Sequence, residues 1–430
     1  MCAMPTRYAV WVLVLMVGIN FLNYMDRWVG SAVAPLIQAE FTLSDFSVGL
    51  LGSAFTLVYA LGALPFGLWA DRGVRRTVIG TGVAVWSLAT LLTGLTTSFA
   101  QLFATRAVLG IGEASYYPAS TSLLGDYFPR QLRGRVMAIW SAGTAFGIAA
   151  GFAGGGLLAA RFGWRVPFFA TAAPGLILAV LAFRLREPLR GAAEEGGPRL
   201  DRTSDASLRA MFALLKIASL RWTILAQTAL YFVLGANAYW LPTLLTRRFG
   251  LSIGGAGTLS GGVIVLGGLI GTLVGGWVAD WRRRSSGRAD VEVAICGFVG
   301  GAIFVTFALV APSVWFVPAF LMAVVCIYLH TGPFTAICQN VVVPSLRGSA
   351  VTVTLLIAHL FGDSYAAAAV GLLSDALGSL QMALLIVSPI LLLAAAALAM
   401  MALRSIQSDT KAMDEQWMEY PRGPAPALPV

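Results

Sequence analysis

Long apolar runs alternate with short polar connections along almost the whole chain. Each run has about 20 residues or more, the length that an α-helix needs to cross the hydrocarbon core of a bilayer. The pattern therefore predicts an all-α membrane protein with twelve transmembrane helices. We place them at roughly 10–36, 46–70, 77–96, 100–124, 135–158, 165–184, 221–246, 254–280, 291–311, 314–342, 348–374 and 378–403.

Two polar segments interrupt this pattern and divide the chain. The first is a central loop at 186–220, and the second is a Pro-rich tail at 405–430 that we expect to be mobile. The division predicts two six-helix bundles, at 1–185 and 221–404. The first apolar run is too long for a signal peptide and has no obvious cleavage site, so we expect it to remain as a helix.

Composition and charge support a membrane protein. Hydrophobic residues make up 58% of the chain and charged residues only 11%, which excludes a soluble enzyme or a disordered chain. If the N-terminus is cytoplasmic, 23 of the 29 Lys and Arg residues fall on the cytoplasmic side and four on the opposite side. This asymmetry predicts that both termini are cytoplasmic. It also accounts for the net charge of +9 without a nucleic-acid partner.

The two halves of the chain repeat one another. Three sets of residues recur at offsets of 208, 209 and 214, each close to half the chain length. They are Phe41, Leu43, Ser44 and Gly49 with Phe249, Leu251, Ser252 and Gly257; Gly67–Asp71 with Gly276–Asp280; and Asp126 with Leu132–Gly134 against Asn340 with Leu346–Gly348. Parallel repeats of this kind are typical of transporters that hold their substrate near the membrane midplane, between the halves.

The segment from Gly67 to Arg76 resembles the cytoplasmic loop signature of the major facilitator superfamily, although Trp69 and Val74 depart from it. Gly67 would let its helix approach a neighbour closely. Asp71 could face a helix N-terminus or a basic partner, and we expect it to act in gating. The same expectation covers Arg72, Arg75, Arg76 and, in the second copy, Asp280. The alternative is a positively charged loop with a helix cap.

Four charged residues lie within predicted membrane helices: Asp26, Arg27, Arg106 and Glu113. Each would cost about 2.5–3.5 kcal/mol if isolated at the bilayer centre. Their formal charges cancel, so mutual pairing can offset much of that cost. Because seven residues fall about 20° short of two helical turns, Arg106 and Glu113 share one helix face. The alternatives are a structural ion-pair cluster, or snorkelling of Asp26 and Arg27 to the interface.

The same residues resemble the Spinster branch of the superfamily. The motifs that carry this resemblance are Asn23–Arg27 and Gly110–Tyr116, with Asp126–Pro129, Arg133–Arg135, Gly163–Arg165 and Arg186–Gly191 in support. The first motif also occurs in organic-anion symporters. The resemblance implies transport of lysolipids or sphingoid phosphates, linked to protons.

The charged residues suggest how such coupling would work. Arg106 suits a phosphate or carboxylate, and Arg27 is a second candidate for substrate binding. Asp26 and Glu113 are the candidates for carrying protons. An anionic substrate that takes over Arg106 would deprive Glu113 of its partner, so that Glu113 binds a proton more readily, which favours co-transport. A substrate amine that displaces the proton would instead give exchange, and the sequence does not choose between these cycles.

Further polar and aromatic residues could line the cavity, although core packing is the alternative for each. These are Asn20, Tyr24, Tyr117, Tyr231, Asn237, Tyr239, His330 and Phe334. His359 and Asp363 are four residues apart, hence on one helix face, and we assign Asp363 to gating.

The chain carries no His-Glu-x-x-His, nucleophile-elbow or nucleotide-binding motif, and its cysteines lack metal-ligand spacing. We therefore expect no enzyme activity, no cofactor and no metal. The function we expect is secondary active transport of an amphiphilic anionic or zwitterionic lipid, coupled to protons, by a monomer in a bacterial inner membrane. The alternatives are a proton-coupled symporter of small organic anions, and a non-transporting receptor or channel.

Overall fold

The computed structural model describes residues 6–189, 214–343 and 346–418, without the side chains at 71, 130 and 416–418. Within these ranges every regular element is a helix. The first half contains α1 (Arg7–Ala32), α2 (Ala34–Phe41), α3 (Asp45–Arg72), α4 (Arg75–Thr93), α5 (Phe99–Ala114), α6 (Tyr116–Tyr127), α7 (Arg130–Phe162) and α8 (Arg165–Phe183). The second contains η1 (Leu214–Lys216), α10 (Ala218–Phe249), α11 (Ile253–Arg283), α12 (Ala289–Val310), α13 (Ser313–Tyr328), α14 (Thr331–Asn340), α15 (Arg347–Ala358), η3 (His359–Asp363), α16 (Ala366–Leu377) and α17 (Leu380–Met418).

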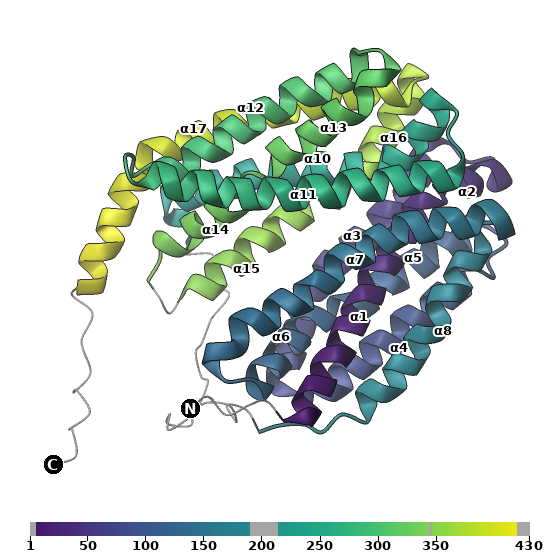
Figure 1. The fold of residues 1–430 in the computed structure, drawn as a ribbon, viewed down its shortest axis with the longest axis horizontal. Coiled ribbons are helices and arrows are strands. Elements are labelled where there is room, and N and C mark those ends of the chain that lie inside the picture. The colour runs from purple at the N-terminus through teal and green to yellow at the C-terminus, as the bar shows by residue number, and fades with distance from the viewer. Residues whose placement is uncertain (1–5, 190–213, 344–345, 419–430) are drawn as a thin grey trace.

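Helices α1–α8 gather on one side of the molecule and α10–α17 on the other (Figure 1). Each side has its own apolar core, around Trp86 in the first half and around Trp240 and Phe298 in the second. The start of α1 and the end of α17 lie at the same end of the molecule, which we call the terminal end. The opposite end, with the turns after α2, α7 and α10, is the far end.

The matched residues Ser44 and Ser252 show what the internal repeat encodes. Each lies just before a long helix, and its hydroxyl accepts a hydrogen bond from the backbone N–H three residues on, at Ser47 (3.2 Å) and Gly255 (3.1 Å). Both therefore satisfy one of the donors left open at a helix N-terminus. The repeat places equivalent helix starts in the two halves.

Among the predicted spans that the structure divides, two are divided at equivalent places of the two halves. The span predicted at 100–124 is divided between α5 and α6, and the span predicted at 314–342 between α13 and α14. Pro118 and Pro333 follow these breaks. Because proline has no backbone N–H, neither can bond to the carbonyl four residues earlier, at Ala114 and Leu329. The helices end or loosen at those residues.

Eleven helical segments within the described residues are long and apolar enough to cross a membrane. The predicted twelfth span is the one divided into α5 and α6, and each of these helices is too short to qualify alone. At the other extreme α17 continues to Met418, so the predicted mobile tail is helical up to that residue. Asp409 secures this extension by accepting a 2.7 Å hydrogen bond from the N–H of Ser219 near the start of α10.

Candidate functional site

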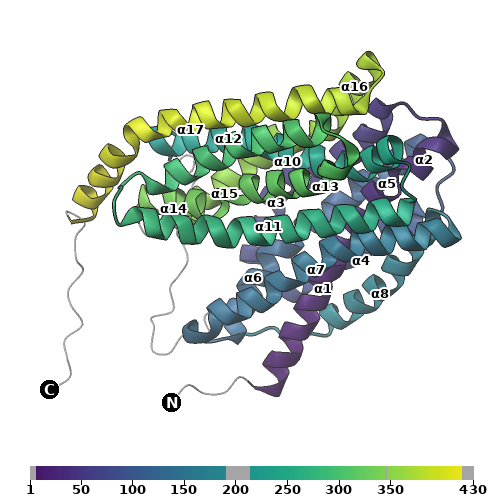
Figure 2. The same ribbon diagram turned by 45° about the horizontal axis from the view of Figure 1, so that its top comes forward.

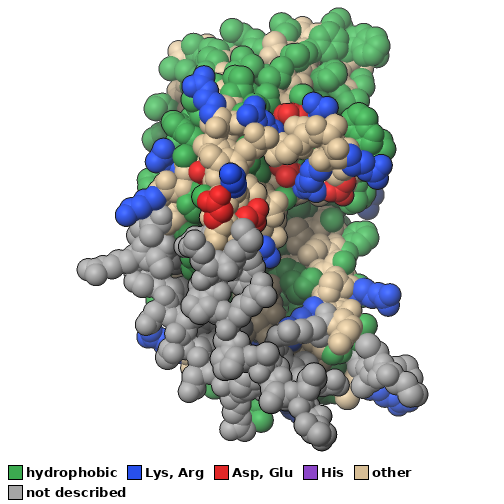
Figure 3. Space-filling view, turned by 90° about the vertical axis from the view of Figure 1, so that its left-hand side faces the viewer, with side chains coloured by type: hydrophobic (Ala, Val, Ile, Leu, Met, Phe, Trp, Pro, Cys, Tyr) green, Lys and Arg blue, Asp and Glu red, His purple; other side chains and the backbone are tan. Residues whose placement is uncertain are grey.

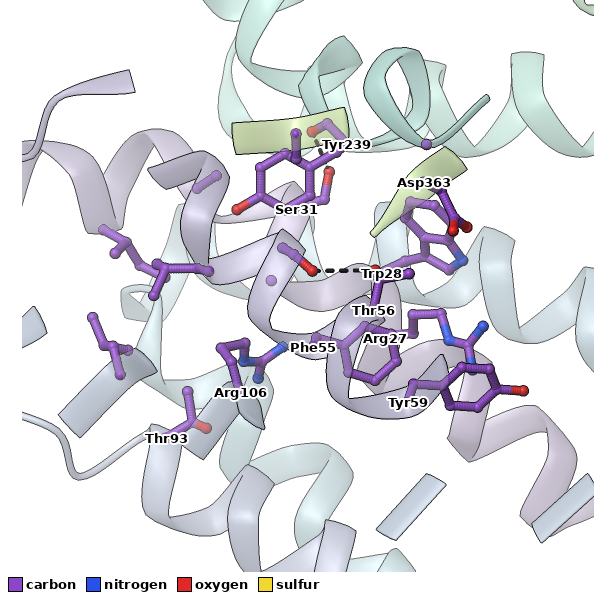
Figure 4. A pocket seen from close by; sticks show the side chains of 18 of the residues that line it. Arg27, Trp28, Ser31, Phe55, Thr56, Tyr59, Thr93, Arg106, Tyr239 and Asp363 are labelled. Carbon is purple, nitrogen blue, oxygen red and sulfur yellow. Dashed lines mark hydrogen bonds between the residues drawn. The ribbon is translucent and has the colours of Figure 1, made fainter. Parts of the chain in front are cut away.

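A pocket lies between the two halves of the chain (Figure 4). It contains about 930 Å³ of empty space, including the part that is continuous with solvent. Helices α1, α2, α3, α4, α5 and α8 contribute from the first half, and α10, η3 and α16 from the second. Both membrane-buried arginines of the sequence, Arg27 and Arg106, line it.

Arg27 projects from α1 into a cage of three aromatic rings. Its guanidinium carbon lies 4.9 Å from the ring centre of Tyr24, 5.0 Å from that of Phe55 and 4.7 Å from that of Tyr59. Cation–π attraction therefore acts on it from three sides. Its Nη2 also donates to Oε2 of Glu113 on α5 at 2.9 Å, and the Glu113 side chain has no exposed surface. Arg27 and Glu113 form a direct buried ion pair.

Asp26 and Arg106 are arranged differently. Asp26 is fully buried, and neither carboxylate oxygen contacts a cation directly among the described residues, although the hydroxyls of Thr90 and Thr171 act on the carboxylate. Arg106 is 6% exposed, its guanidinium carbon lies 5.2 Å from the ring centre of Phe168, and its Nη2 also has no partner there. The positive charge of Arg106 acts on Asp26, but the two groups make no direct hydrogen bond among the described contacts. This pair keeps polar atoms available for a ligand.

The sequence interpretation takes Arg106 as the partner of Glu113, and the structure corrects this. Arg106 and Glu113 do lie on one helix, but the Glu113 carboxylate bonds to Arg27 on α1. The spacing along α5 shows which residues share a face, and it cannot show which residue of a neighbouring helix comes opposite. A substrate at Arg106 alone therefore leaves the Glu113 ion pair intact.

The second half contributes a histidine–carboxylate pair to the pocket. His359 Nδ1 lies 2.9 Å from Oδ2 of Asp363 across the short π-helical segment η3, as their shared face predicts. The His359 ring meets Tyr231 edge-on at 5.0 Å and Tyr59, from the first half, at 6.1 Å. Tyr59 thus belongs to the Arg27 cage and also contacts His359.

The pocket is closed toward the far end by contacts between the halves. Ser31 donates from α1 to the Tyr239 carbonyl on α10 at 2.6 Å, as drawn in Figure 4. The Tyr239 hydroxyl donates in turn to the Val48 carbonyl on α3 at 2.6 Å. Tyr239, a predicted lining residue, therefore lines the pocket and also joins the halves.

A denser network lies beyond this contact, around Asp45 at the start of α3. The Asp45 carboxylate accepts from Arg247 on α10 at 2.8 Å and from Ser374 on α16 at 2.6 Å. Asp375 on α16 caps α3 in return, because its carboxylate accepts from the N–H groups of Asp45 and Phe46 at 2.9 Å each. Charged and capping interactions from three helices thus hold the halves together at the far end.

Apart from Asp363, which lines the pocket, the predicted gating residues lie at the terminal end, where Figure 3 shows Lys and Arg side chains gathered. The side chain of Asp71 lies outside the described part of the structure. Arg75 is fully buried and pairs with Asp126 and Glu187. Arg76 donates to the Leu185 carbonyl at 2.9 Å, and the Arg72 side chain is exposed.

Asp280, in the second copy of the loop, pairs with Arg283 three residues on. Arg283 also pairs with Asp290 at the start of α12. The described contacts of Arg75, Arg76 and Asp280 therefore lie within one half of the chain each, and the Asp280 contact stays within α11.

Several predicted lining residues are instead turned into the helix bundles. Asn20 donates to the Trp140 carbonyl and to Thr144, both at 2.9 Å, and so joins α1 to α7. Asn237 donates to Ser388 at 2.8 Å and joins α10 to α17. His330 donates to the Ile327 carbonyl at 2.7 Å and packs with Phe298 and Phe334.

Tyr24 and Tyr231 contact pocket side chains, through Arg27 and His359, while Tyr117 packs edge-on against Trp140 at 5.4 Å. Phe55 and Tyr59 are pocket residues that the sequence interpretation missed. They are four residues apart and therefore share one face of α3. Two aromatic residues at this spacing, in a chain with a charged residue on a neighbouring membrane helix, were the sequence signal that could have identified them.

Comparisons with known proteins agree with this architecture. A family model described as Major Facilitator Superfamily matches residues 16–362. Human protein spinster homolog 1 is 32% identical over 395 residues, which cover 87% of this chain and 74% of the human protein. The sphingosine-1-phosphate transporter SPNS2 of Danio rerio is 29% identical over 380 residues, covering 83% and 74%.

Solved structures show the same fold. A bacterial homolog of the human lysosomal transporter Spinster, in an inward-facing and unoccupied conformation, superposes with a TM-score of 0.83. It is 24% identical in sequence, and the match covers 98% of this chain and 100% of that one.

The fold, the pocket between the halves and the matching family model define the class of protein: a transporter of the major facilitator superfamily, embedded in the membrane with many crossings and not an enzyme. Within that superfamily the chain belongs to the Spinster family.

Proposed function

We propose that the protein moves an amphiphilic lipid with an anionic or zwitterionic headgroup, such as a lysophospholipid or a sphingoid phosphate, by alternating access and together with protons. The observation that carries this proposal is the buried guanidinium of Arg106. It lines the pocket between the halves with Nη2 lacking a partner among the described residues. A phosphate or carboxylate supplies the paired acceptor oxygens that a guanidinium prefers.

The remaining walls suit an acyl chain. Ile37, Leu51, Leu102 and Phe168 line the same pocket as Arg106. Burial of an alkyl chain against them gains roughly 0.8 kcal/mol for each CH₂ group. The two cations of the pocket, Arg27 and Arg106, both come from the first half, and the second half contributes His359 and Asp363. This distribution suits one headgroup and one tail better than a small dianion held by cations from both sides.

The buried carboxylates supply the coupling in this proposal. Asp26 is the group that can gain or lose a proton without breaking a direct ion pair, because Arg106 acts on it without a direct contact. Glu113 takes a proton when substrate or a conformational change draws Arg27 away. Either event links substrate movement to protonation, and the order of the two fixes co-transport or exchange.

Alternating access follows from the uneven contacts between the halves. The Asp45 network holds the far end together. With both termini cytoplasmic in a bacterial inner membrane, as the Lys and Arg distribution predicts, this arrangement is the inward-open half of the cycle. Opening the far end requires Asp45 to leave Arg247 and Ser374.

The test is uptake into proteoliposomes with a substrate panel, with and without an inward proton gradient. The panel contains lysophosphatidylcholine, lysophosphatidylglycerol, sphingosine 1-phosphate and the sugar acid gluconate. We expect uptake of at least one lysolipid or sphingoid phosphate, accelerated by the gradient. Uptake of gluconate with none of the lipids would overturn the substrate class in favour of a small organic anion. Lipid uptake that ignores the gradient would overturn the proton coupling.

A further inference from the structure

Helix α11 carries glycines on several faces, and neighbouring helices explain most of them. A Cβ atom at Gly261 would lie 3.1 Å from the Phe152 Cβ of α7, and one at Gly267 would lie 2.7 Å from Val324 Cγ1 of α13. Gly262 is different, because a Cβ there would meet no heavy atom within 4 Å. Its backbone is ordinary helix, so neither close packing nor a left-handed turn requires glycine at this position.

Gly262 lies in the floor of an apolar groove on the outside of the helix bundle. The groove holds about 880 Å³ of empty space, including the part continuous with the surroundings, between α11, the end of α7 and the start of α13. Its walls include Leu157, Leu266, Val317 and Leu321. The Thr258 hydroxyl, which also lines it, donates to the carbonyl of its own helix at 2.8 Å, so the surface offered is apolar.

The groove matches one leaflet of a bilayer in length. Its lining on α11 runs from Gly254, beside the far end, to Leu266. At 1.5 Å per residue these twelve steps span about 18 Å, close to half of the roughly 30 Å hydrocarbon core. Leu157 and Leu266 are more than half exposed, so the groove faces the surrounding lipid.

A wall of packed side chains separates this groove from the central pocket. Trp28 lines the pocket and stacks on Phe152 at 4.9 Å. Phe152 in turn covers Gly257 and Gly261, which turn toward α7. Figure 2 shows α7 and α11 side by side along this contact. An occupant of the groove therefore lies outside the transport pocket.

One cation lies at the far-end mouth of the groove. Arg161 is one helical turn beyond Leu157, and helical side chains lean back over the preceding turn, which places Arg161 above the Leu157 wall. Its side chain is exposed and makes no hydrogen bond or ion pair with the described residues. Its neighbours at this end are engaged: Arg165 with Glu40, and Arg247 with Asp45.

We propose that the groove holds an acyl chain of an anionic glycerophospholipid of the bilayer, with the lipid phosphate at Arg161. The apolar length, the open space over Gly262 and the unengaged cation at the mouth define this occupant together. The site is separate from the transported substrate, because the Trp28–Phe152 wall lies between them. It would make the contact of α7 with α11, where the two halves meet, sensitive to the surrounding lipid.

Native mass spectrometry of the purified, delipidated protein tests this site by titration with phosphatidylglycerol or phosphatidylcholine. We expect wild-type protein to retain one phosphatidylglycerol molecule at least threefold more tightly than phosphatidylcholine. Arg161→Gln should abolish that preference while leaving the acyl-chain site in place. Gly262→Phe should fill the groove and weaken retention of both lipids at least fivefold.

Gly276→Phe is the matched control, because a Cβ at Gly276 on the same helix also meets no heavy atom within 4 Å. It lies outside the groove and should leave lipid retention unchanged. Equal retention in wild type and Gly262→Phe would overturn the proposal, as would equal losses in the two phenylalanine variants. An unchanged phosphatidylglycerol preference in Arg161→Gln, a surface substitution that leaves the fold intact, would overturn the assignment of the headgroup.

Discussion

The first half buries two acid–base pairs, Arg27 with Glu113 and Asp26 with Arg106, and each pair joins one of two adjacent residues of α1 to α5. The two pairs offset the cost of burying their charges in different ways. Arg27 bonds directly to Glu113 within a cage of three rings. Asp26 and Arg106 influence each other through space without a direct contact, and one Arg106 nitrogen lacks a described partner. A direct pair lowers the energy of the empty protein. An incomplete pair leaves energy to be gained when a ligand or proton arrives.

We expect this difference between the two pairs to separate stability from transport. Breaking a direct buried pair by removing one partner should cost stability. Removing the incomplete pair should cost function with little change in stability.

The largest effect is expected for Arg106→Ala. Loss of the unengaged guanidinium should reduce lysolipid uptake to the level of protein-free liposomes, because no other cation in the pocket lacks an ion-pair partner among the described residues. The variant should remain folded in the membrane, with a thermal unfolding midpoint close to that of wild type. Uptake assays and intrinsic-fluorescence melting measure the two properties. Full uptake by Arg106→Ala would remove Arg106 from the site.

Arg27→Ala should have the largest effect on stability. It leaves the Glu113 carboxylate buried without its partner, which typically costs about 3–5 kcal/mol. Glu113→Gln should stay folded, because the amide oxygen still accepts from Arg27, but it should lose transport. In the variant that carries both substitutions, Arg27→Ala should lower the free energy of unfolding by less than it does in the wild-type background. A double-mutant cycle from melting data checks this, and strictly additive effects would show that the pair contributes no coupling energy.

Asp26→Asn should act on coupling. The substitution removes the group that can exchange a proton without breaking a direct ion pair, so uptake should lose most of its dependence on the proton gradient while lipid binding persists. Uptake at equal and unequal pH on the two sides measures this. A gradient dependence as strong as that of wild type would move the coupling role to another group.

The smallest effect is expected at the exposed pair of Glu40 and Arg165, in which Glu40 on α2 lies outside the membrane-spanning helices and Arg165 is the first residue of α8. Hydrogen bonds from Arg165 and Trp164 hold the pKa of Glu40 below its ordinary value. Stability from this group is therefore present above that ordinary value and is lost as the pH falls through the lowered pKa. Glu40→Gln should cost less than about 1 kcal/mol at neutral pH, and nothing in strong acid. Melting midpoints across pH 3–7 test this, with exposed Glu415→Gln as the control.

The sequence predicts the helical architecture well because the bilayer imposes a simple rule on length and apolarity. It also identifies the four intramembrane charges, since each is costly enough to require a reason. Helix spacing does not reveal that Glu113 meets Arg27, because this depends on how α1 and α5 are rotated against each other. The sequence shows Pro118 and Pro333, but it does not show that the helices break before them. Transmembrane helices tolerate proline, so a proline alone does not predict that a helix ends.

Lining residues were harder to predict than charges. Asn20 and Asn237 looked like cavity groups because they are polar in an apolar helix, and both instead join helices by hydrogen bonds inside one half. A buried amide satisfies itself wherever a partner is near, so polarity alone does not show the direction in which it points. His359 and Asp363 could be paired from their spacing because both lie on the same helix.

The most direct test of the central claim is lipid binding to the purified protein, separated from transport. Binding of a lysophospholipid should be measured by calorimetry for wild type, Arg106→Gln and Arg27→Gln in the same detergent. The account predicts at least a tenfold loss of affinity for Arg106→Gln, and a smaller loss for Arg27→Gln, whose partner in the empty protein is Glu113. Equal affinity of wild type and Arg106→Gln would contradict it.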